Sequence, residues 1–440
     1  MATIIPIGDI WFQLTLILAI AVLSHFLISR FRQPMVMGEI LIGIILGPTI
    51  VGYVLGCAFY SPGDIVLLFD LQTTQLLASI GAIVLLFIIG LECDIREIYT
   101  RRSAAIALGG VIVPWILGYF FALYLLPPSV TAGFPATAIF VGVALVATSV
   151  AVTATILAEM NLLESSVAKM ILGAAVVDDI LGMVILSISS GVTGGDILLF
   201  GYSVDIGLYA LYLIVISTLF IILGAFLGSR HVCRLVGYVH ARAEARNIRH
   251  AGFLVALGIT FLYAFISESI GISAIVGAFV AGTVFSGNPL KKELKKGAGY
   301  LSAVFVPIFF ISLGLLVDFS GLYGAHNDLV FYLIFGIGLT AAAMVSKVIG
   351  CGIPARLMGA SAKESVAIGI GMTPRLEVAL IIAVYALSQA IIHTYVYSVI
   401  VLMGVLTALV TPPILRRALA WEKSPEEKVK SPGAMESRET

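Results

Sequence analysis

The stretch Ile171–Leu186, ILGAAVVDDILGMVIL, places two adjacent aspartates in the middle of an apolar segment. Asp178 and Asp179 lie 11 and 12 residues beyond Val167, roughly 17 Å along a helix that rises about 1.5 Å per residue. That depth is near the middle of a hydrocarbon core about 30 Å thick. Ionisable groups there cost at least ~2.5–3.5 kcal/mol each, so they mark function or pair with one another. The stretch predicts a membrane helix with an acid pair at its centre.

The composition places most of the chain in lipid as well. Of 440 residues, 60% are apolar and 11% are charged, too little charge to cover the surface of a water-soluble protein of this length. The formal net charge is zero, which gives no reason to expect a nucleic-acid partner. The cysteines and histidines are scattered, without the clustered spacing of a disulfide framework or a zinc site. We therefore expect a membrane protein that is not an enzyme and has no cofactor.

Runs of about 20 apolar residues, the length that crosses a bilayer, predict an all-α polytopic protein with thirteen transmembrane helices. The first run lacks the basic start and the cleavage site of a signal peptide, so it counts as a helix. The expected spans lie near residues 10–29, 35–54, 74–91, 104–126, 134–158, 167–190, 204–228, 251–268, 271–286, 299–317, 329–352, 363–388 and 392–415.

The distribution of lysine and arginine predicts the orientation. The odd-numbered connections and the C-terminal tail carry these residues, and the even-numbered connections carry none. By the positive-inside rule the N-terminus is outside and the C-terminus is cytoplasmic, in the inner (plasma) membrane of the cell. The longest cytoplasmic connection is expected at residues 229–250. The polar, proline-containing tail at 421–440 is expected to be disordered.

Two of the expected spans are interrupted near their middle. The fifth contains ATSVAVTAT (Ala147–Thr155), and the twelfth contains GIGMTPRLE (Gly369–Glu377), where Pro374 lacks a backbone donor. The second and ninth spans share glycine-spaced segments, GEILIGIILGP (Gly38–Pro48) and AIVGAFVAGTV (Ala274–Val284). Both pairs are seven spans apart. An odd offset reverses the direction of crossing, so the pattern predicts an inverted repeat with two crossed discontinuous helices, a feature typical of ion sites near the midplane. Ordinary kinked helices remain the alternative.

Three further charged residues, Lys347, Arg375 and Glu377, lie inside expected spans. Lys347, in SKVIG (Ser346–Gly350), precedes Arg356 at the cytoplasmic end by nine residues, which places it at a depth similar to that of the aspartates. An acid pair and a buried lysine at one depth point to an ion pair or a transport site.

With these motifs the chain resembles the cation:proton antiporter superfamily, especially its second branch of bacterial and archaeal sodium/proton antiporters. Leu376 stands where the PRGEV motif of that family has glycine. The motifs that carry the resemblance run in family order through residues 35–415: GEILIGIILGP, FIIGLE (Phe87–Glu92), ATSVAVTAT, VVDDILG, FFISLGLLVD (Phe309–Asp318), KVIG and GMTPRLEVALI (Gly371–Ile381).

The resemblance implies a transmembrane unit over residues 1–420 that forms a homodimer. In this unit a core of spans 104–190 and 329–415 would move against a dimerisation or scaffold domain of spans 10–91 and 204–317. Asp179 would be the essential carboxylate for ion and proton, and Asp178 would be the partner of Lys347. The resemblance further implies that Thr148 and Ser149 contribute to ion binding, that Arg375 and Glu377 order the second broken helix, and that transport is electrogenic.

The chemistry of an aspartate suits exchange, because protonation removes the charge that holds a metal ion. The expected substrates are protons with Na⁺ or Li⁺, bound transiently at Asp179 and Asp178. A K⁺/H⁺ antiporter or potassium efflux system is the main alternative, and a sodium-coupled organic anion symporter or a passive channel is less favoured. An intramembrane aspartyl protease needs two aspartates on different helices, whereas Asp178 and Asp179 are adjacent.

Overall fold

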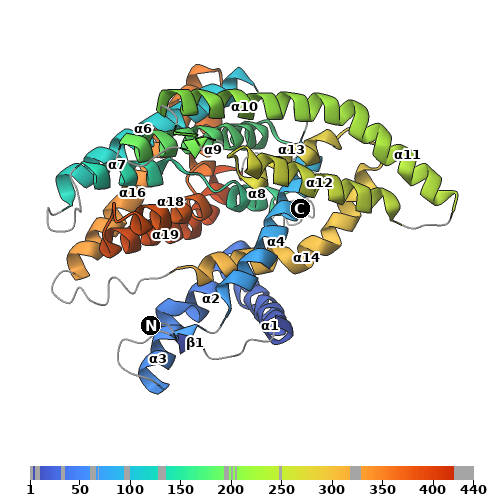
Figure 1. The fold of residues 1–440 in the computed structure, drawn as a ribbon. Coiled ribbons are helices and arrows are strands. Elements are labelled where there is room, and N and C mark those ends of the chain that lie inside the picture. The colour runs from blue at the N-terminus through green and yellow to red at the C-terminus, as the bar shows by residue number, and fades with distance from the viewer. Residues whose placement is uncertain are drawn as a thin grey trace, which may run out of the picture.

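The computed structural model is an assembly of helices with four two-residue strands (Figure 1). It describes residues 3–4, 10–30, 35–59, 66–67, 69–93, 100–126, 135–192, 198–199, 202–203, 206–246, 250–317 and 329–420. The tail expected to be disordered lies outside these residues. Strand β1 (Thr3–Ile4) pairs in parallel with β2 (Val66–Leu67), and β3 (Leu198–Leu199) pairs antiparallel with β4 (Tyr202–Ser203).

The helices follow the apolar runs of the sequence. They are α1 (Ile10–Ser29), α2 (Met35–Leu46), α3 (Tyr53–Phe59), α4 (Leu71–Leu91), α6 (Arg101–Leu125), α7 (Ala136–Val146), α8 (Val150–Glu159), α9 (Ser166–Val192), α10 (Ile206–Leu227), α11 (Cys233–Glu244), α12 (Ala251–Ser269), α13 (Ala274–Val284), α14 (Lys291–Leu315), α16 (Leu329–Leu357), α17 (Ala362–Gly371), α18 (Glu377–Ser388) and α19 (Thr394–Ala418). Short π-helical turns, η1 (Pro48–Gly52) and η3 (Gly228–Val232), join α2 to α3 and α10 to α11.

Ten helical segments within the described ranges are long and apolar enough to cross a membrane, which confirms a multi-pass membrane protein. Burial differs widely among them. In the segment Ala136–Glu159, 89% of the most apolar window is buried, against 18% in Gly207–Glu244. The interrupted fifth span is therefore central, and α10 lies at the periphery.

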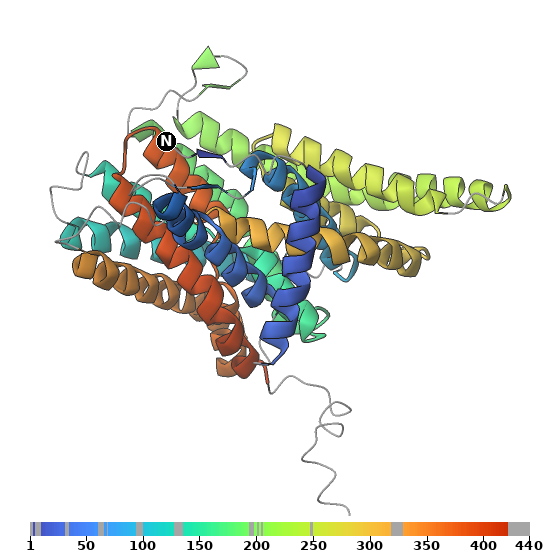
Figure 2. The same cartoon turned by 90° about the horizontal axis from the view of Figure 1, so that it is seen from below.

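The long connection expected at residues 229–250 contains helix, because η3 covers Gly228–Val232 and α11 covers Cys233–Glu244. Helix α10 continues through η3 into α11, which reaches outward beside α12 (Figure 2). Residues 233–246 contain no proline, and Val236 and Ala243 are buried while Arg234 and Arg242 are exposed. This segment is an amphipathic helix, whose apolar positions pack on the protein while its arginines face outward.

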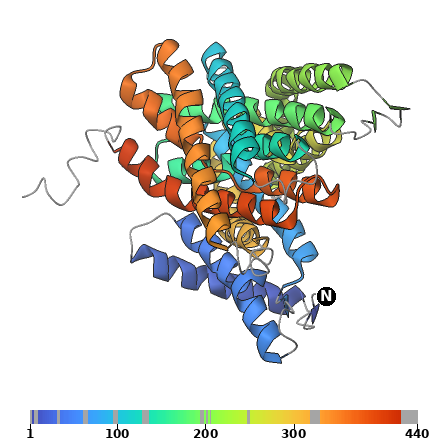
Figure 3. The ribbon, with the colours of Figure 1, turned by 90° about the vertical axis from the view of Figure 1, so that its left-hand side faces the viewer.

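The helices pack in two groups. Helices α6 to α9 pack mainly with α16 to α19, and we call these the core group. Helices α1 to α4 pack mainly with α10 to α14, and we call these the scaffold group. In Figure 3, α16 and α6 of the core group lie side by side, and α1 to α3 lie at the far edge of the molecule.

Glycines bring several helices to backbone contact. A Cβ atom on Gly43 of α2 would lie 2.3 Å from the Ile311 carbonyl oxygen of α14, and one on Gly90 of α4 would lie 2.3 Å from the Phe279 carbonyl oxygen of α13. Each contact is reciprocal, since Gly314 faces Gly43 and Gly282 faces Gly90. The two glycine-spaced segments noted in the sequence are thus helix-packing surfaces.

Candidate functional site

Both predicted helix interruptions are present, and they meet. Residues 147–149 separate α7 from α8, and residues 372–376 separate α17 from α18. The two breaks cross, because the Ser149 backbone N–H donates to the Pro374 carbonyl oxygen at 2.7 Å. The Ser149 hydroxyl accepts from the Val152 N–H at 3.4 Å and so caps the start of α8. At the crossing, one backbone hydrogen bond therefore joins the two non-helical segments.

Threonine hydroxyls satisfy the carbonyl oxygens at the end of α17. A helix leaves its last carbonyls without intrahelical donors. Thr153 donates to the Gly371 oxygen at 2.6 Å, Thr148 donates to the Met372 oxygen at 3.3 Å, and Thr373 donates to the Ile370 oxygen at 2.7 Å. Of these residues, sequence analysis had singled out Thr148 alone, although Thr153 belongs to the same hydroxyl-rich ATSVAVTAT segment.

Arg375 satisfies the end of α7. Its guanidinium group is fully buried, with Nε donating to the Leu145 oxygen at 2.7 Å and Nη1 donating to the Ala343 oxygen of α16 at 2.8 Å. The C-terminal end of a helix carries a partial negative charge, so a cation stabilises it. The sequence predicted that Arg375 orders its own break; the structure also joins it to the other broken helix. Glu377 is the first residue of α18, and its side chain lies outside the described part.

A buried ion pair lies beside the crossing. Lys347 Nζ of α16 is 2.7 Å from Asp178 Oδ1 of α9, and both side chains have 0% exposure. The predicted pairing is therefore present. The second carboxylate oxygen of Asp178, Oδ2, is buried without a hydrogen-bond partner among the described residues. Thr148, from the break between α7 and α8, lies near this carboxylate. Asp179 follows on the same helix and is half-buried.

Helix α6 closes over the ion pair at a glycine that sequence analysis missed. A Cβ atom on Gly110 would lie 2.5 Å from Cys351 Sγ and 3.4 Å from Lys347 Nζ. Cys351 is one helical turn beyond Lys347 and is fully buried. The four-residue spacing could have indicated Cys351, because residues i and i+4 share a helix face. No comparable pattern marks Gly110, which is one of 44 glycines in the chain.

Clusters of three or more His, Cys, Asp or Glu side chains suited to a metal ion do not occur in the residues that the structure describes. A small cation at the crossing would therefore need hydroxyl and carbonyl oxygens in addition to carboxylates. Those are the oxygen ligands that hard cations take. The described residues at and beside the crossing include the Asp178 carboxylate, the Thr148 hydroxyl and the backbone carbonyl oxygens of the two breaks.

A known protein family and several known proteins are similar to this chain over most of its length. The family model described as sodium/hydrogen exchanger, transmembrane, matches residues 15–421. The Na(+)/H(+)-K(+) antiporter GerN of Bacillus cereus is 34% identical over 411 residues, covering 93% of this chain and 96% of the relative. The high-affinity Na(+)/H(+) antiporter NhaS3 of Synechocystis sp. is 31% identical over 430 residues, covering 92% and 89%.

A solved structure shares the fold. The sodium proton antiporter MjNhaP1 from Methanocaldococcus jannaschii superposes with a TM-score of 0.60 at 17% identity, covering 93% of this chain and 96% of that chain. Apolar helices, two crossed breaks and buried charges define a membrane transporter rather than an enzyme. The chain belongs to the sodium/hydrogen exchanger family. It is a monovalent cation/proton antiporter, which confirms the resemblance found in the sequence.

Proposed function

We propose that this antiporter exchanges Na⁺ for protons electrogenically across the plasma membrane, with Asp179 binding either ion in turn. The observation that carries the proposal is the fully buried Lys347–Asp178 pair beside a half-buried second aspartate. A carboxylate at that position binds a metal cation when ionised and releases it when protonated. Competition for one carboxylate thus couples the two ions, because the site holds one or the other.

The electrostatics of the two breaks favour a cation site on the α17 side. Arg375 places a full positive charge at the end of α7. At the end of α17 the Gly371 and Met372 carbonyls accept from neutral hydroxyls. Arg375 reaches that side only through a long contact of 3.4 Å with the Thr373 oxygen, so it offsets the partial negative charge less there than at α7. Asp179, the free Oδ2 of Asp178 and the Thr148 hydroxyl would complete a set of hard oxygen ligands for a dehydrated sodium ion.

The ion pair offers a source for a second proton. As sodium enters, its charge competes with Lys347 for Asp178, and the lysine released from the pair can give up its own proton. Two protons would then cross against one sodium ion, and the net charge would couple transport to the membrane potential. Each charge moved is worth about 2.3 kcal/mol per 100 mV.

We further propose thirteen transmembrane crossings arranged as an inverted repeat, with the N-terminus outside and the C-terminus cytoplasmic. The glycine contacts support this arrangement. Gly43 joins the second and tenth expected spans, and Gly90 joins the third and ninth. A seven-span offset converts the first of these contacts into the second. In this proposal the core group moves against the scaffold group, and the scaffold forms a homodimer in the bilayer.

Potassium is the second candidate cation. The name of the relative GerN includes K⁺ as well as Na⁺, and that relative covers nearly the whole chain. The oxygen ligands proposed here are suited to either ion, since cavity dimensions rather than ligand type separate them.

The test is proton flux in proteoliposomes that contain the purified protein, measured with Na⁺, Li⁺ and K⁺ and with or without an imposed potential. We expect Na⁺ and Li⁺ to drive flux that rises with the potential. Asp179→Asn should abolish flux while the protein keeps its thermal stability, and Glu164→Gln, at an exposed acid beyond α8, should leave flux unchanged. Normal flux in Asp179→Asn would overturn the carboxylate assignment. Flux that is indifferent to the potential would overturn electrogenic exchange.

A further inference from the structure

We infer that Glu159, at the end of α8, fastens the core group to the scaffold group through a contact that opens in every transport cycle. This inference rests on the proposed movement of the two groups. We call the contact the latch and define it as Glu159, Met35 and Arg416. It lies on the membrane face that we propose is cytoplasmic, far along α8 from the crossing.

One carboxylate joins the two helix groups. Glu159 Oε1 accepts a hydrogen bond from the Met35 backbone N–H at 3.0 Å, and Oε2 accepts one from Arg416 Nη2 at 2.7 Å. Met35 is the first residue of α2 in the scaffold group, whereas Arg416 lies on α19 in the core group. The first N–H groups of a helix have no intrahelical acceptor and carry a partial positive charge, so a carboxylate fits there.

The position of Glu159 on its own helix is unfavourable. It is the last residue of α8, where the helix already carries a partial negative charge. An acid at that position gains its stabilisation from outside α8, here from the start of α2 and from Arg416. Separation of the two groups would remove the α2 contribution and leave Arg416 alone to offset the partial negative charge at the end of α8. Because the carboxylate loses stabilisation when the groups separate and regains it when they meet, the contact can act as a reversible latch.

A second pair of charges lies next to the latch. Glu39 of α2, one turn beyond Met35, is 3% exposed and pairs with His25 of α1 at 2.7 Å. Glu39 and His25 lie close enough to Glu159 for their charges to interact. Two acids thus face two basic groups, His25 and Arg416, across the junction of α1, α2, α8 and α19. These charged residues belong to both helix groups, so separating the groups would change the electrostatic energy of the junction.

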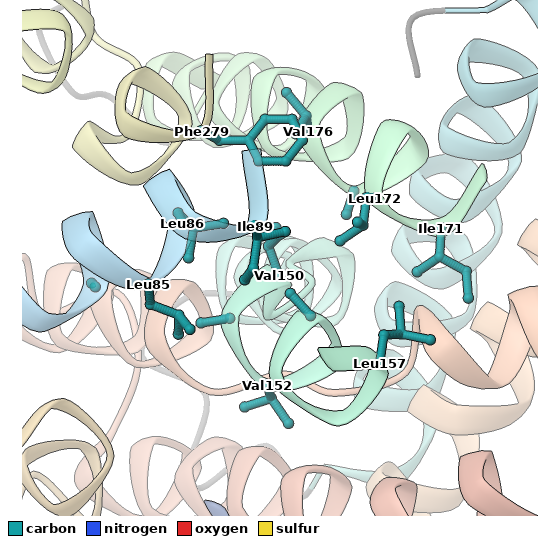
Figure 4. Close-up of a cluster of buried hydrophobic side chains, with 14 of the residues drawn as sticks. Leu85, Leu86, Ile89, Val150, Val152, Leu157, Ile171, Leu172, Val176 and Phe279 are labelled. Atoms are coloured by element: carbon teal, nitrogen blue, oxygen red, sulfur yellow. The ribbon is translucent and has the colours of Figure 1, made fainter. Parts of the chain in front are cut away.

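The junction between the two groups at the other end of α8 is apolar. In Figure 4, Leu85, Leu86 and Ile89 of α4 lie against Val150 of α8, with Phe279 of α13 nearby. Such contacts are non-directional and depend on buried area. The hydrogen bonds of Glu159 depend on distance and angle. An apolar surface tolerates sliding, whereas the latch holds one register of the two groups.

Helix α8 connects the latch to the ion site. Its ten residues rise about 15 Å from the Ser149 cap to Glu159. A helix of this length moves as a unit, so opening the latch would release the start of α8 and the Thr148 backbone beside Asp178. Glu159 is therefore a positioning residue for transport.

The first test is a cross-link across the latch. Met35→Cys with Glu159→Cys, in a background where the exposed Cys57 is replaced by serine, should join on treatment with a short bis-methanethiosulfonate, which forms a disulfide with each thiol, as mass spectrometry would report. We expect cross-linking to lower exchange at least ten-fold and reduction to restore it. Each variant with one introduced cysteine, in the same background and treated in the same way, is the control. Undiminished exchange by the cross-linked protein would overturn the latch.

The second test needs no cross-link. Glu159→Ala should favour the open latch, so the apparent cation KM should fall on the cytoplasmic side and rise on the other side, because apparent affinity scales with the population of the competent state. Glu164→Ala, an exposed acid five residues further on, is the matched control. A Glu159→Ala protein with KM values unchanged, or changed equally on both sides, would contradict the inference. Using Na⁺, Li⁺ and K⁺ in turn separates a wrong ion assignment from a wrong latch.

Discussion

In the two broken helices, the carbonyl groups that end the first half accept hydrogen bonds from different kinds of donor. At the end of α7, the Leu145 carbonyl accepts from the guanidinium group of Arg375. At the end of α17, the Gly371 and Met372 carbonyls accept from the hydroxyls of Thr153 and Thr148. A guanidinium group has donors but no acceptor, whereas a hydroxyl keeps lone pairs for a further partner. One end is therefore closed by a fixed charge, and the other stays able to share in binding a cation.

The largest effect is expected where the fixed charge is removed. Arg375→Met would leave the Leu145 carbonyl buried without its donor, at about 1–3 kcal/mol, whereas the Ala343 carbonyl keeps the Ser346 hydroxyl as a donor. We expect a loss of roughly 1–3 kcal/mol in stability, visible as a lowered unfolding temperature in detergent. Arg417→Met, which changes an exposed arginine on α19, should shift stability by less than about 0.5 kcal/mol. Equal behaviour of the two variants would refute the role given to Arg375.

A smaller effect is expected at the other end. Thr153→Val keeps the shape of the side chain but leaves the Gly371 oxygen without its donor, at a cost of about 1–2 kcal/mol. Thr155 is the matched control, because its hydroxyl donates to the Ala151 oxygen of its own helix at 2.9 Å. Thr155→Val should cost less than about 0.5 kcal/mol. Thermal unfolding of both proteins measures the difference, and equal losses would show that the crossing contact adds nothing.

The smallest stability effect is expected for Thr148→Val, since its 3.3 Å contact with the Met372 oxygen is long. A loss of about 0.5–1 kcal/mol in unfolding measurements would fit a weak hydrogen bond. Transport should respond more strongly, because the variant loses a proposed ligand, and we expect a several-fold rise in the KM for sodium. Thr148→Ser, which keeps the hydroxyl, should restore it. A KM that stays at the parent value in Thr148→Val would remove Thr148 from the site.

Sequence patterns predicted the positions of the breaks because proline and clustered hydroxyls act locally. Pro374 cannot donate a backbone hydrogen bond, and ATSVAVTAT offers side chains that compete with helical bonding. Counted depths predicted that Lys347 lies at the level of the two aspartates, and charges in lipid need partners. That Asp178 is the partner of Lys347 was implied by the family resemblance.

What the sequence did not predict depends on contacts between distant segments. Nothing near Arg375 says that its guanidinium group reaches Leu145, which lies on a different broken helix. The role of Gly110 could not be predicted from the sequence around it, because that role is to leave room for Cys351 and Lys347. The helical form of the connection after Leu227 was not predicted. Its basic residues indicated the side of the membrane, and its arginines and alanines, which are good helix formers, were not used to predict its secondary structure.

The backbone contacts at glycine have a genetic consequence. An alanine at Gly90 would meet the main chain of α13, and one at Gly109 would lie 2.1 Å from the Gly350 carbonyl oxygen of α16. A clash between side chains can be relieved by shortening the partner, but a carbonyl group has no shorter form. A selection for revertants of Gly90→Ala or Gly109→Ala should therefore recover glycine at the original codon, with few second-site suppressors on the facing helix.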